Sequence, residues 1–293
     1  MDDQTVLFER LRPRLFGLAY RMLGMRGDAE DLVQEAYLRW HEADQALVRN
    51  PEAWLVATTT RLAIDRLRRL KTERDAYKGP WLPEPILTDL QAPDHVVELA
   101  SDLSLAFLVL LERLAPEERA AFLLHDVFDC SYPDISRILE KSETACRQTV
   151  ARARDRVRTD RKRFEATAEE KEMMLRRFTA ALDARDEQSL LAIFTPDSVW
   201  TADGGGRTAA SPIPILGAAR IVKLVLGLTK NLNGGTMRMG LVNGEPGLHV
   251  YVDGRLIAAM AVDLDDGRIA AVYAVVNPEK LAVTDRPSFP SLQ

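Results

Sequence analysis

The sequence has little cysteine, and its two cysteines stand at no spacing that is typical of a metal or redox site. Only Cys130 and Cys146 occur in 293 residues, which does not make a disulfide framework. No run approaches the ~18 consecutive apolar residues that span a bilayer. The first residues, 1–3, are acidic where a signal peptide would be basic. We expect a cytoplasmic protein that needs no metal, no cofactor and no membrane.

Composition says little about nucleic acid, because the net charge is only −5. Hydrophobic residues make up 46% and charged residues 28% of the chain, which is typical of a globular protein with ample core material. The basic residues are clustered, however, and this uneven placement carries more information than the total. At ~150 residues per domain, the length predicts two or three domains.

The front of the chain, residues 1–75, has helical periodicity. Asp28 stands just before an apolar stripe and is predicted to cap a helix. Pro51 suits the first turn of a second helix that runs to about Leu70. The segment 78–85, Lys-Gly-Pro-Trp-Leu-Pro-Glu-Pro, cannot continue a helix and is expected to be extended.

Helical patterns return over about 93–163, and one further amphipathic helix is expected over 169–186. Three β-prone runs follow: Leu248–Val252, Leu256–Leu264 and Ile269–Val276. Asp-Gly pairs at 253–254 and 266–267 separate them and predict hairpins. The fold class expected is multidomain, with two all-α modules and then an α+β domain that begins near residue 165.

Residues 131–158 have the pattern of a helix-turn-helix. Ser131 and Ser142 can each cap a short helix. The second helix has a narrow inward stripe that includes Cys146, which is therefore expected to be a core residue and not a sensor thiol. Its outward positions are Thr144, Arg147, Gln148, Arg154 and Arg158. Arginine and glutamine near the start of a recognition helix suit base edges in the major groove.

Further arginines and lysines on and after this helix suit phosphates better than bases. They are Arg152, Arg156, Arg161, Lys162 and Arg163. A basic, solvated bundle helix would share this charge run. The paired caps and the inward stripe of small residues favour DNA binding over that interpretation.

Residues 122–129, 132–135 and 146–148 resemble region 4 of extracytoplasmic-function sigma factors of RNA polymerase. The resemblance implies that this module reads the −35 promoter element and contacts the flap of the polymerase. The family usually has glycine in the turn, where this chain has Glu140 and Lys141. A non-glycine residue can occupy such a turn at modest cost.

The front module resembles region 2 of the same family. Residues 27–37 match the helix that docks on the β′ subunit, which implies a polymerase-binding role for Asp31, Gln34 and Glu35. An ordinary solvated face would have the same pattern. Residues 50–55 and 61–69 match the segment that holds the melted −10 element. Backbone contacts with DNA would come from Arg61, Arg66, Arg68 and Arg69.

Three short motifs resemble the subgroup of these sigma factors that carries a fused, cone-shaped SnoaL-like domain. They consist of Trp81, Leu82, Pro83, Glu84 and Pro85; Asp203, Gly204, Gly205, Gly206 and Arg207; and Asn277, Pro278, Glu279, Lys280 and Leu281. The resemblance implies that the C-terminal domain regulates the sigma factor in cis. We hypothesise that the linker docks near the second and third motifs, although the glycines also suit a mobile loop.

The domains expected are region 2 (1–75), a proline-rich linker (76–100), region 4 (101–164) and the SnoaL-like domain (165–293). The function expected is promoter-specific initiation and not catalysis. The partners are the β and β′ subunits of RNA polymerase core, promoter DNA and an unidentified small molecule in the C-terminal cavity. Two alternatives stay open: a ligand-sensing helix-turn-helix regulator, and an enzyme that uses Asp203, His249 or Tyr251.

Overall fold

The computed structural model describes residues 3–44, 47–88, 104–161, 166–231 and 235–282. The chain forms two compact units. The helical unit comprises Met1–Ala76 and Leu108–Asp160, and the sheet unit comprises Tyr77–Phe107 and Arg161–Gln293. Each unit is described by itself. The linker segment that begins at Tyr77 thus belongs with the C-terminal domain.

The helical unit starts with three helices: α1 (Asp3–Leu23), α2 (Arg26–Glu42) and α3 (Pro51–Asp75). The predicted second helix is confirmed: Asn50 caps α3 by accepting a hydrogen bond from the Ala53 N–H, and Pro51 lies in the first turn. The predicted cap at Asp28 is wrong. Helix α2 begins two residues earlier, and the Asp28 carboxylate accepts hydrogen bonds from Arg66 on α3.

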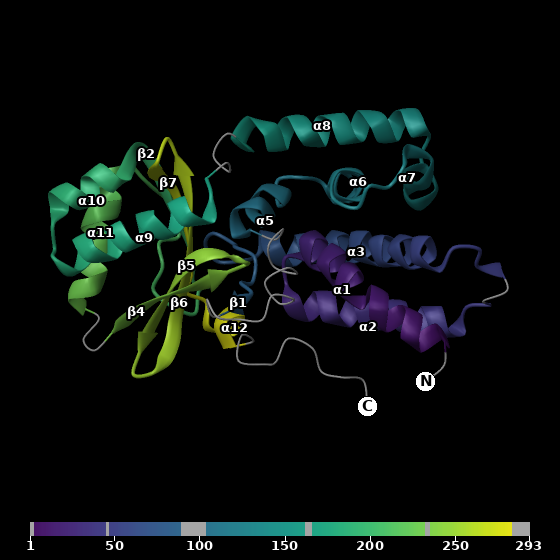
Figure 1. Ribbon diagram of the computed structural model, residues 1–293, viewed down its shortest axis with the longest axis horizontal. Helices are drawn as coiled ribbons and strands as arrows, with labels where there is room; N and C mark the ends of the chain where they lie inside the picture. The colour runs from purple at the N-terminus through teal and green to yellow at the C-terminus, as the bar shows by residue number, and fades with distance from the viewer. Residues whose placement is uncertain (1–2, 45–46, 89–103, 162–165, 232–234, 283–293) are drawn as a thin grey trace. The chain divides into compact units, whose positions relative to one another are not determined.

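The next described helices along the chain are short except for α8 (Figure 1). They are α5 (Leu105–Leu111), α6 (Pro116–Asp126), α7 (Tyr132–Leu139) and α8 (Glu143–Arg161). Helix α6 packs against α1 and α3, and α7 packs against α3. The two predicted helical modules therefore lie in one compact unit.

A partly buried ion cluster joins the helices of this unit. The Glu112 carboxylate pairs with Arg74 at the end of α3 and with Arg119 on α6. Arg119, 2% exposed, also donates to the Met22 carbonyl at 2.7 Å. Because an uncompensated buried charge is costly, each member of the cluster constrains the others.

The sheet unit contains one mixed sheet of seven strands in the order β1-β4-β5-β6-β7-β2-β3. The strands are β1 (Leu87–Thr88), β2 (Phe194–Asp203), β3 (Ile215–Leu216), β4 (Thr236–Val242), β5 (Glu245–Val252), β6 (Arg255–Asp265) and β7 (Arg268–Val275). Strands β2 and β7 pair in parallel, and the other pairs are antiparallel. The predicted three-stranded meander is β5-β6-β7.

The two Asp-Gly hairpins are confirmed. Asp253 and Asp266 have φ values of 50° and 48°, and the glycine after each is also left-handed. This is the backbone of a type I′ turn, which matches the twist of paired strands.

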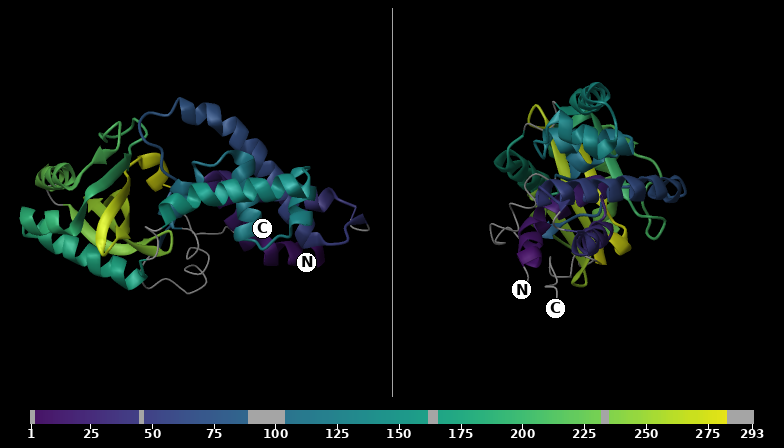
Figure 2. Two further views of the ribbon diagram at one scale, coloured as in Figure 1. Left: turned by 90° about the horizontal axis from the view of Figure 1, so that it is seen from above. Right: turned by 90° about the vertical axis from the view of Figure 1, so that its right-hand side faces the viewer.

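Helices α9 (Ala168–Asp183), α10 (Glu187–Ile193) and α11 (Ala218–Asn231) cover one side of the sheet (Figure 1). The sheet twists strongly, as the view from above shows (Figure 2). Its concave face and the helices share an apolar core that includes Phe178, Phe194 and Val222. The short α12 (Pro278–Leu281) follows β7. This is the α+β architecture expected from the sequence for the C-terminal domain.

Candidate functional site

The helix-turn-helix has the local geometry that the sequence predicts. The Ser131 hydroxyl accepts a hydrogen bond from the Asp134 N–H at 3.3 Å, and Ser142 caps α8 through the Ala145 N–H at 3.2 Å. Glu140 takes the left-handed conformation in the turn, with φ 54° and ψ 43°. The glutamate thus adopts a left-handed backbone that glycine takes at lower cost.

The inward face of α8 is as predicted. Cys146, Val150 and Ala153 are completely buried, and Val157 is nearly so. Burial raises the pKa of the Cys146 thiol, which suits a core residue and not a reactive thiolate.

The outward face of α8 combines exposed side chains with ion pairs. Thr144, Arg147 and Gln148 are exposed at the start of the helix, and the Arg147 guanidinium lies 4.2 Å from the centre of the Tyr132 ring. Arg154 forms a two-pronged ion pair with Asp126, with contacts of 2.6 to 3.1 Å. Arg147 also pairs with Glu143 one turn earlier, at 3.4 Å.

The residues that were predicted to contact phosphates differ in their surroundings. Arg152 and Arg156 both approach Glu118, at 4.0 and 2.6 Å. Arg161 is the last residue of α8. Arg158, which was predicted as an outward-facing position of the same helix, lies three residues earlier. Lys162 and Arg163 lie outside the described residues.

The basic residues predicted on α3 have partners within the helical unit. Arg61 donates to the carbonyls of Arg137 and Ile138 at the end of α7, at 2.9 and 3.1 Å. Arg68 pairs with Glu117 at 2.7 Å. Arg69 is exposed and Arg66 is held by Asp28. Sequence patterns do not reveal these intramolecular contacts.

The three predicted polymerase-binding residues lie together on the exposed face of α2. Asp31, Gln34 and Glu35 are all exposed, and Glu35 pairs with Arg39 one turn later at 2.6 Å. Leu38, which is 53% exposed, adds an apolar side chain to this helix. The face thus combines acidic and apolar groups.

In the sheet unit the three sequence motifs converge on one buried ion pair. Asp203 and Lys280 are 0% and 3% exposed, and their Oδ2 and Nζ atoms are 2.7 Å apart. Asp203 Oδ2 also accepts the Leu82 N–H at 2.8 Å, and Lys280 donates to the Leu82 carbonyl. The linker backbone is therefore held from both sides at Leu82.

Two aromatic rings also contact this buried ion pair. The Lys280 ammonium lies 4.2 Å from the centre of the Trp81 ring and 5.2 Å from that of Tyr77, distances that favour cation–π attraction. The Tyr77 hydroxyl donates to Asp203 Oδ1 at 2.6 Å and accepts from Asn277 at 2.9 Å. Burial and the hydrogen bond to Asp203 raise the pKa of Tyr77.

Tyr77 was not among the residues predicted from the sequence. It directly precedes the proline-rich segment, and its part in the anchor depends on Asp203, which lies 126 residues further along the chain. The predicted residues Leu82, Pro83, Glu84 and Pro85 are all buried. We name the set of Tyr77, Trp81, Leu82, Asp203, Asn277 and Lys280 the linker anchor.

The glycines after Asp203 have a steric reason. Gly205 and Gly206 have φ values of 58° and 69°. A Cβ on Gly205 would overlap the Asn277 amide and would lie 2.9 Å from the Tyr77 oxygen, and one on Gly206 would lie 2.8 Å from Lys78. Gly204 is buried, whereas Arg207 is exposed and pairs with Glu279 at 2.9 Å. Close approach of the linker thus favours glycine here.

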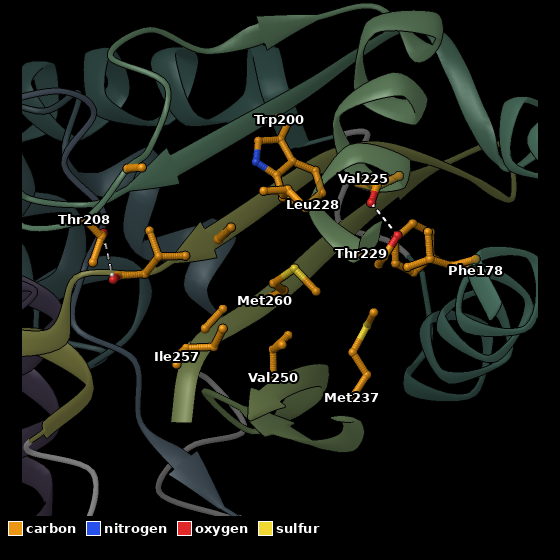
Figure 3. Close-up of a pocket in the computed structure, with 15 residues that line it drawn as sticks. Phe178, Trp200, Thr208, Val225, Leu228, Thr229, Met237, Val250, Ile257 and Met260 are labelled. Carbon is orange, nitrogen blue, oxygen red and sulfur yellow. Dashed lines mark hydrogen bonds between the residues drawn. The ribbon is translucent and has the colours of Figure 1, made fainter. Parts of the chain in front are cut away.

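The concave side of the sheet encloses a cavity of about 310 Å³ between the strands and helices α9 and α11. Trp200, Val250, Met237 and Met260 point into it (Figure 3). His249 and Tyr251 belong to the opposite face of β5 and line a different pocket with Leu87 and Pro278.

The residues that were candidates for catalysis therefore do not meet in this cavity. His249 and Tyr251 face away from it, and Asp203 is paired with Lys280. Among the described residues, no group of three or more His, Cys, Asp or Glu side chains is placed to hold a metal ion. No described helix is both long and apolar enough to cross a membrane.

Comparison with known proteins identifies the class of protein. The model of Sigma-70 region 2 matches residues 7–73, and the model of Sigma-70 region 4 matches residues 104–157. These are the two helical modules described above. They define an RNA polymerase sigma factor, a class that binds polymerase core and promoter DNA.

Relatives that match over nearly the whole chain narrow this class. The ECF RNA polymerase sigma factor SigJ of Mycobacterium tuberculosis is 36% identical over 286 residues, which cover 93% of this chain and 91% of the relative. The probable ECF sigma factor SigI of the same species is 28% identical, covering 96% and 95%. The chain therefore belongs to the extracytoplasmic-function family of RNA polymerase sigma factors.

A solved structure agrees over both units. The crystal structure of SigJ from M. tuberculosis matches with a TM-score of 0.79 and 33% identity, covering 96% of this chain and 99% of that chain. The C-terminal domain is thus shared with this relative. The sigma factor family is not enzymatic.

Proposed function

We propose that this sigma factor recognises its promoters through α8 and α3 and that its C-terminal domain regulates it in cis by holding the linker. In this proposal Thr144, Arg147 and Gln148 read the −35 element. The α3 arginines track the melted −10 strand, and the face of α2 with Asp31, Gln34 and Glu35 docks on the β′ subunit. The domain limits proposed are 1–75, 76–100, 101–164 and 165–293.

The linker anchor is the observation that carries the regulatory part of the proposal. A buried Asp–Lys pair that also binds both backbone groups of Leu82 fixes one end of the segment that joins regions 2 and 4. Fixing a connecting segment restricts how two tethered modules can be spaced. Promoter recognition needs a particular spacing of regions 2 and 4. In this proposal, holding or releasing the linker therefore changes promoter recognition.

The ion pairs on α3 and α8 are compatible with DNA binding. Arg68 and Arg154 are 56% and 43% exposed in their pairs with Glu117 and Asp126, and exposed pairs contribute only ~0–1 kcal/mol each. Phosphates of promoter DNA can therefore replace these carboxylates. Binding should weaken steeply with salt.

We also propose that the C-terminal domain catalyses nothing and that its cavity binds a small molecule. The lining of the cavity supports this, because it is mostly apolar, as Phe178, Val225 and Met260 illustrate. Acid–base catalysis would need a titratable group beside the substrate. This argues against the enzyme alternative. The regulator alternative would require a dimer that reads two half-sites.

Run-off transcription with core RNA polymerase tests the proposal. The template contains the upstream region of the chain's own gene, and the full chain is compared with one that ends after Arg163 and with Asp203→Asn in the full chain. We expect specific initiation by the full chain and an altered transcript yield in both variants. No initiation together with no binding to core would contradict the sigma assignment. Equal yields from all three would contradict regulation by the linker anchor.

A further inference from the structure

The cavity of the sheet unit has a lining that restricts what it can bind. Its walls come from α9, α11 and the concave faces of β2 and β4–β7. None of the lining side chains is charged. An ion would lose its hydration there without compensation, so a charged ligand is disfavoured.

The side-chain polar groups of the lining are the hydroxyls of Thr208 and Thr229 and the indole N–H of Trp200, which can only donate. The Thr229 hydroxyl donates to the Val225 carbonyl at 3.0 Å, and the Thr208 hydroxyl donates to the Val276 carbonyl at 3.1 Å. Each hydroxyl proton is used within the protein, whereas the oxygen can still accept a hydrogen bond. A ligand with one weak N–H or O–H donor on an apolar body suits these two acceptors.

The volume and the flexible side chains agree with a small organic molecule. About 310 Å³ lies at the lower end of the range of ~300–1,000 Å³ that is typical of ligand pockets. Met237 on β4 and Met260 on β6 both point into the cavity from the sheet (Figure 3), and methionine adapts to the shape of an apolar ligand. Leu228, which is 45% exposed, and Thr208, which is exposed, mark the open end.

The open end of the cavity is also next to the linker anchor. Thr208 and Val276 line the cavity, and the Val276 N–H donates to the Asp203 carbonyl at 2.8 Å. Val276 directly precedes Asn277, and Thr208 follows the glycines that contact the linker. An occupant that moves Thr208 or Val276 therefore moves backbone that holds Asp203 and Asn277.

We propose that this cavity binds a neutral, largely apolar small molecule and that its occupancy changes how firmly the linker anchor holds the linker. The second half rests on the proposed regulatory function. The first half is independent of it, because binding is measured on the purified chain without polymerase or DNA.

A matched pair of fluorescent probes tests the first half. N-phenyl-1-naphthylamine is neutral and apolar with one N–H donor, and 1-anilinonaphthalene-8-sulfonate has the same skeleton with an anionic group. We expect saturable binding of the neutral probe to the full chain, with the anionic probe weaker by about tenfold or more. No saturable binding of the neutral probe, or equal binding of both, would overturn the proposal.

Two cavity-filling variants and one control locate the probe. Ala258→Phe and, separately, Ala274→Leu place larger side chains in the cavity and should weaken binding by about tenfold or more. The control Ala184→Phe enlarges an exposed alanine beyond the end of α9 and should bind as the unaltered chain does. The milder Ala274→Leu keeps the test valid if Ala258→Phe does not fold. Unchanged binding in every folded cavity variant would overturn the site.

Trypsin cleavage after the exposed Lys78 tests the coupling to the linker. Saturating neutral probe should change the cleavage rate by about threefold or more in the unaltered chain and in Ala184→Phe. It should have no effect in Ala258→Phe. An unchanged rate at saturation would overturn the coupling. Because transcription is not measured here, failure of this test is distinct from failure of the sigma assignment.

Discussion

Asp203 and Lys280 form an ion pair 2.7 Å long in which both side chains are almost entirely buried. The same two side chains bind the N–H and the carbonyl of Leu82. A buried ion pair adds little net stability over apolar packing, but it is very sensitive to the loss of one partner. The pair therefore specifies where the linker lies more than it strengthens the domain.

Asp203→Asn should leave the Lys280 charge buried without its counter-ion. We expect a loss of about 3–5 kcal/mol in the free energy of unfolding of the sheet unit, measured by urea denaturation, and faster trypsin cleavage after Lys78. The control is Glu279→Gln, which removes an ion pair with Arg207 whose side chains are 62% and 64% exposed. It should cost less than about 1 kcal/mol. Equal losses in both variants would contradict the proposed role of the buried pair.

Gly205→Ala should release the linker for a steric reason. The new Cβ would overlap the Asn277 amide and lie 2.9 Å from the Tyr77 oxygen, on a backbone with φ 58°. The left-handed backbone costs about 1 kcal/mol, and the overpacking adds about 1–3 kcal/mol. The control Gly254→Ala has φ 75° with nothing within 4 Å, so it should show only the first cost. Thermal unfolding measures the loss of stability in each variant, and trypsin cleavage after Lys78 shows whether the linker is released. If Gly254→Ala also exposed Lys78, the steric explanation would be wrong.

The side chains of α8 should divide into two classes in DNA binding. Arg147→Ala removes an exposed guanidinium near the helix start. It should cost about 1–3 kcal/mol on the cognate −35 element, with less discrimination at one base pair. Arg152→Ala should weaken binding to all sequences alike and reduce the salt slope by about 1. Both are measured by fluorescence anisotropy of labelled duplexes with the full chain at several salt concentrations. If Arg147→Ala lost the same affinity for every DNA sequence, this would argue against base reading by Arg147.

The linker anchor should also respond to high pH. The folded pKa of Tyr77 is raised above its ordinary value of 10.0. Its contribution to stability is thus fully present below pH 10 and is lost as the pH rises through the folded pKa. Tyr77→Phe lacks this titration, so its stability should fall less steeply above pH 10 than that of the unaltered chain. Urea denaturation at pH 8 to 11 checks this, and parallel profiles would contradict it.

Local signals in the sequence predict much of this fold. Ser131 and Ser142 cap the helices they were expected to cap, and the turns at Asp253 and Asp266 are hairpins, because these residues act on backbone within a few positions. Strand β2 was not predicted. It contains Pro196 and Asp197, and its pairing with β7 is interrupted between Phe194 and Val199, so its hydrophobic alternation is broken.

The site was less predictable because its contacts are long-range. Asp203 and Lys280 were identified by motif resemblance, but their mutual pairing and the role of Tyr77 depend on the fold. Similarly, the sequence places His249 and Val250 on opposite faces of a strand. Only the curvature of the whole sheet decides that Val250 faces the apolar cavity.

The parallel pairing of β2 with β7 has a practical consequence for protein engineering. Both strands end at the same edge, in a register that sets Asp203 opposite Val275, and the linker is held there. Inserting or deleting one residue in either strand would shift that register and separate the groups that hold Leu82. The tight turns at Asp253-Gly254 and Asp266-Gly267 do not take part in the linker anchor. They are therefore the places to attach a dye or an affinity tag when the linker is to be observed undisturbed.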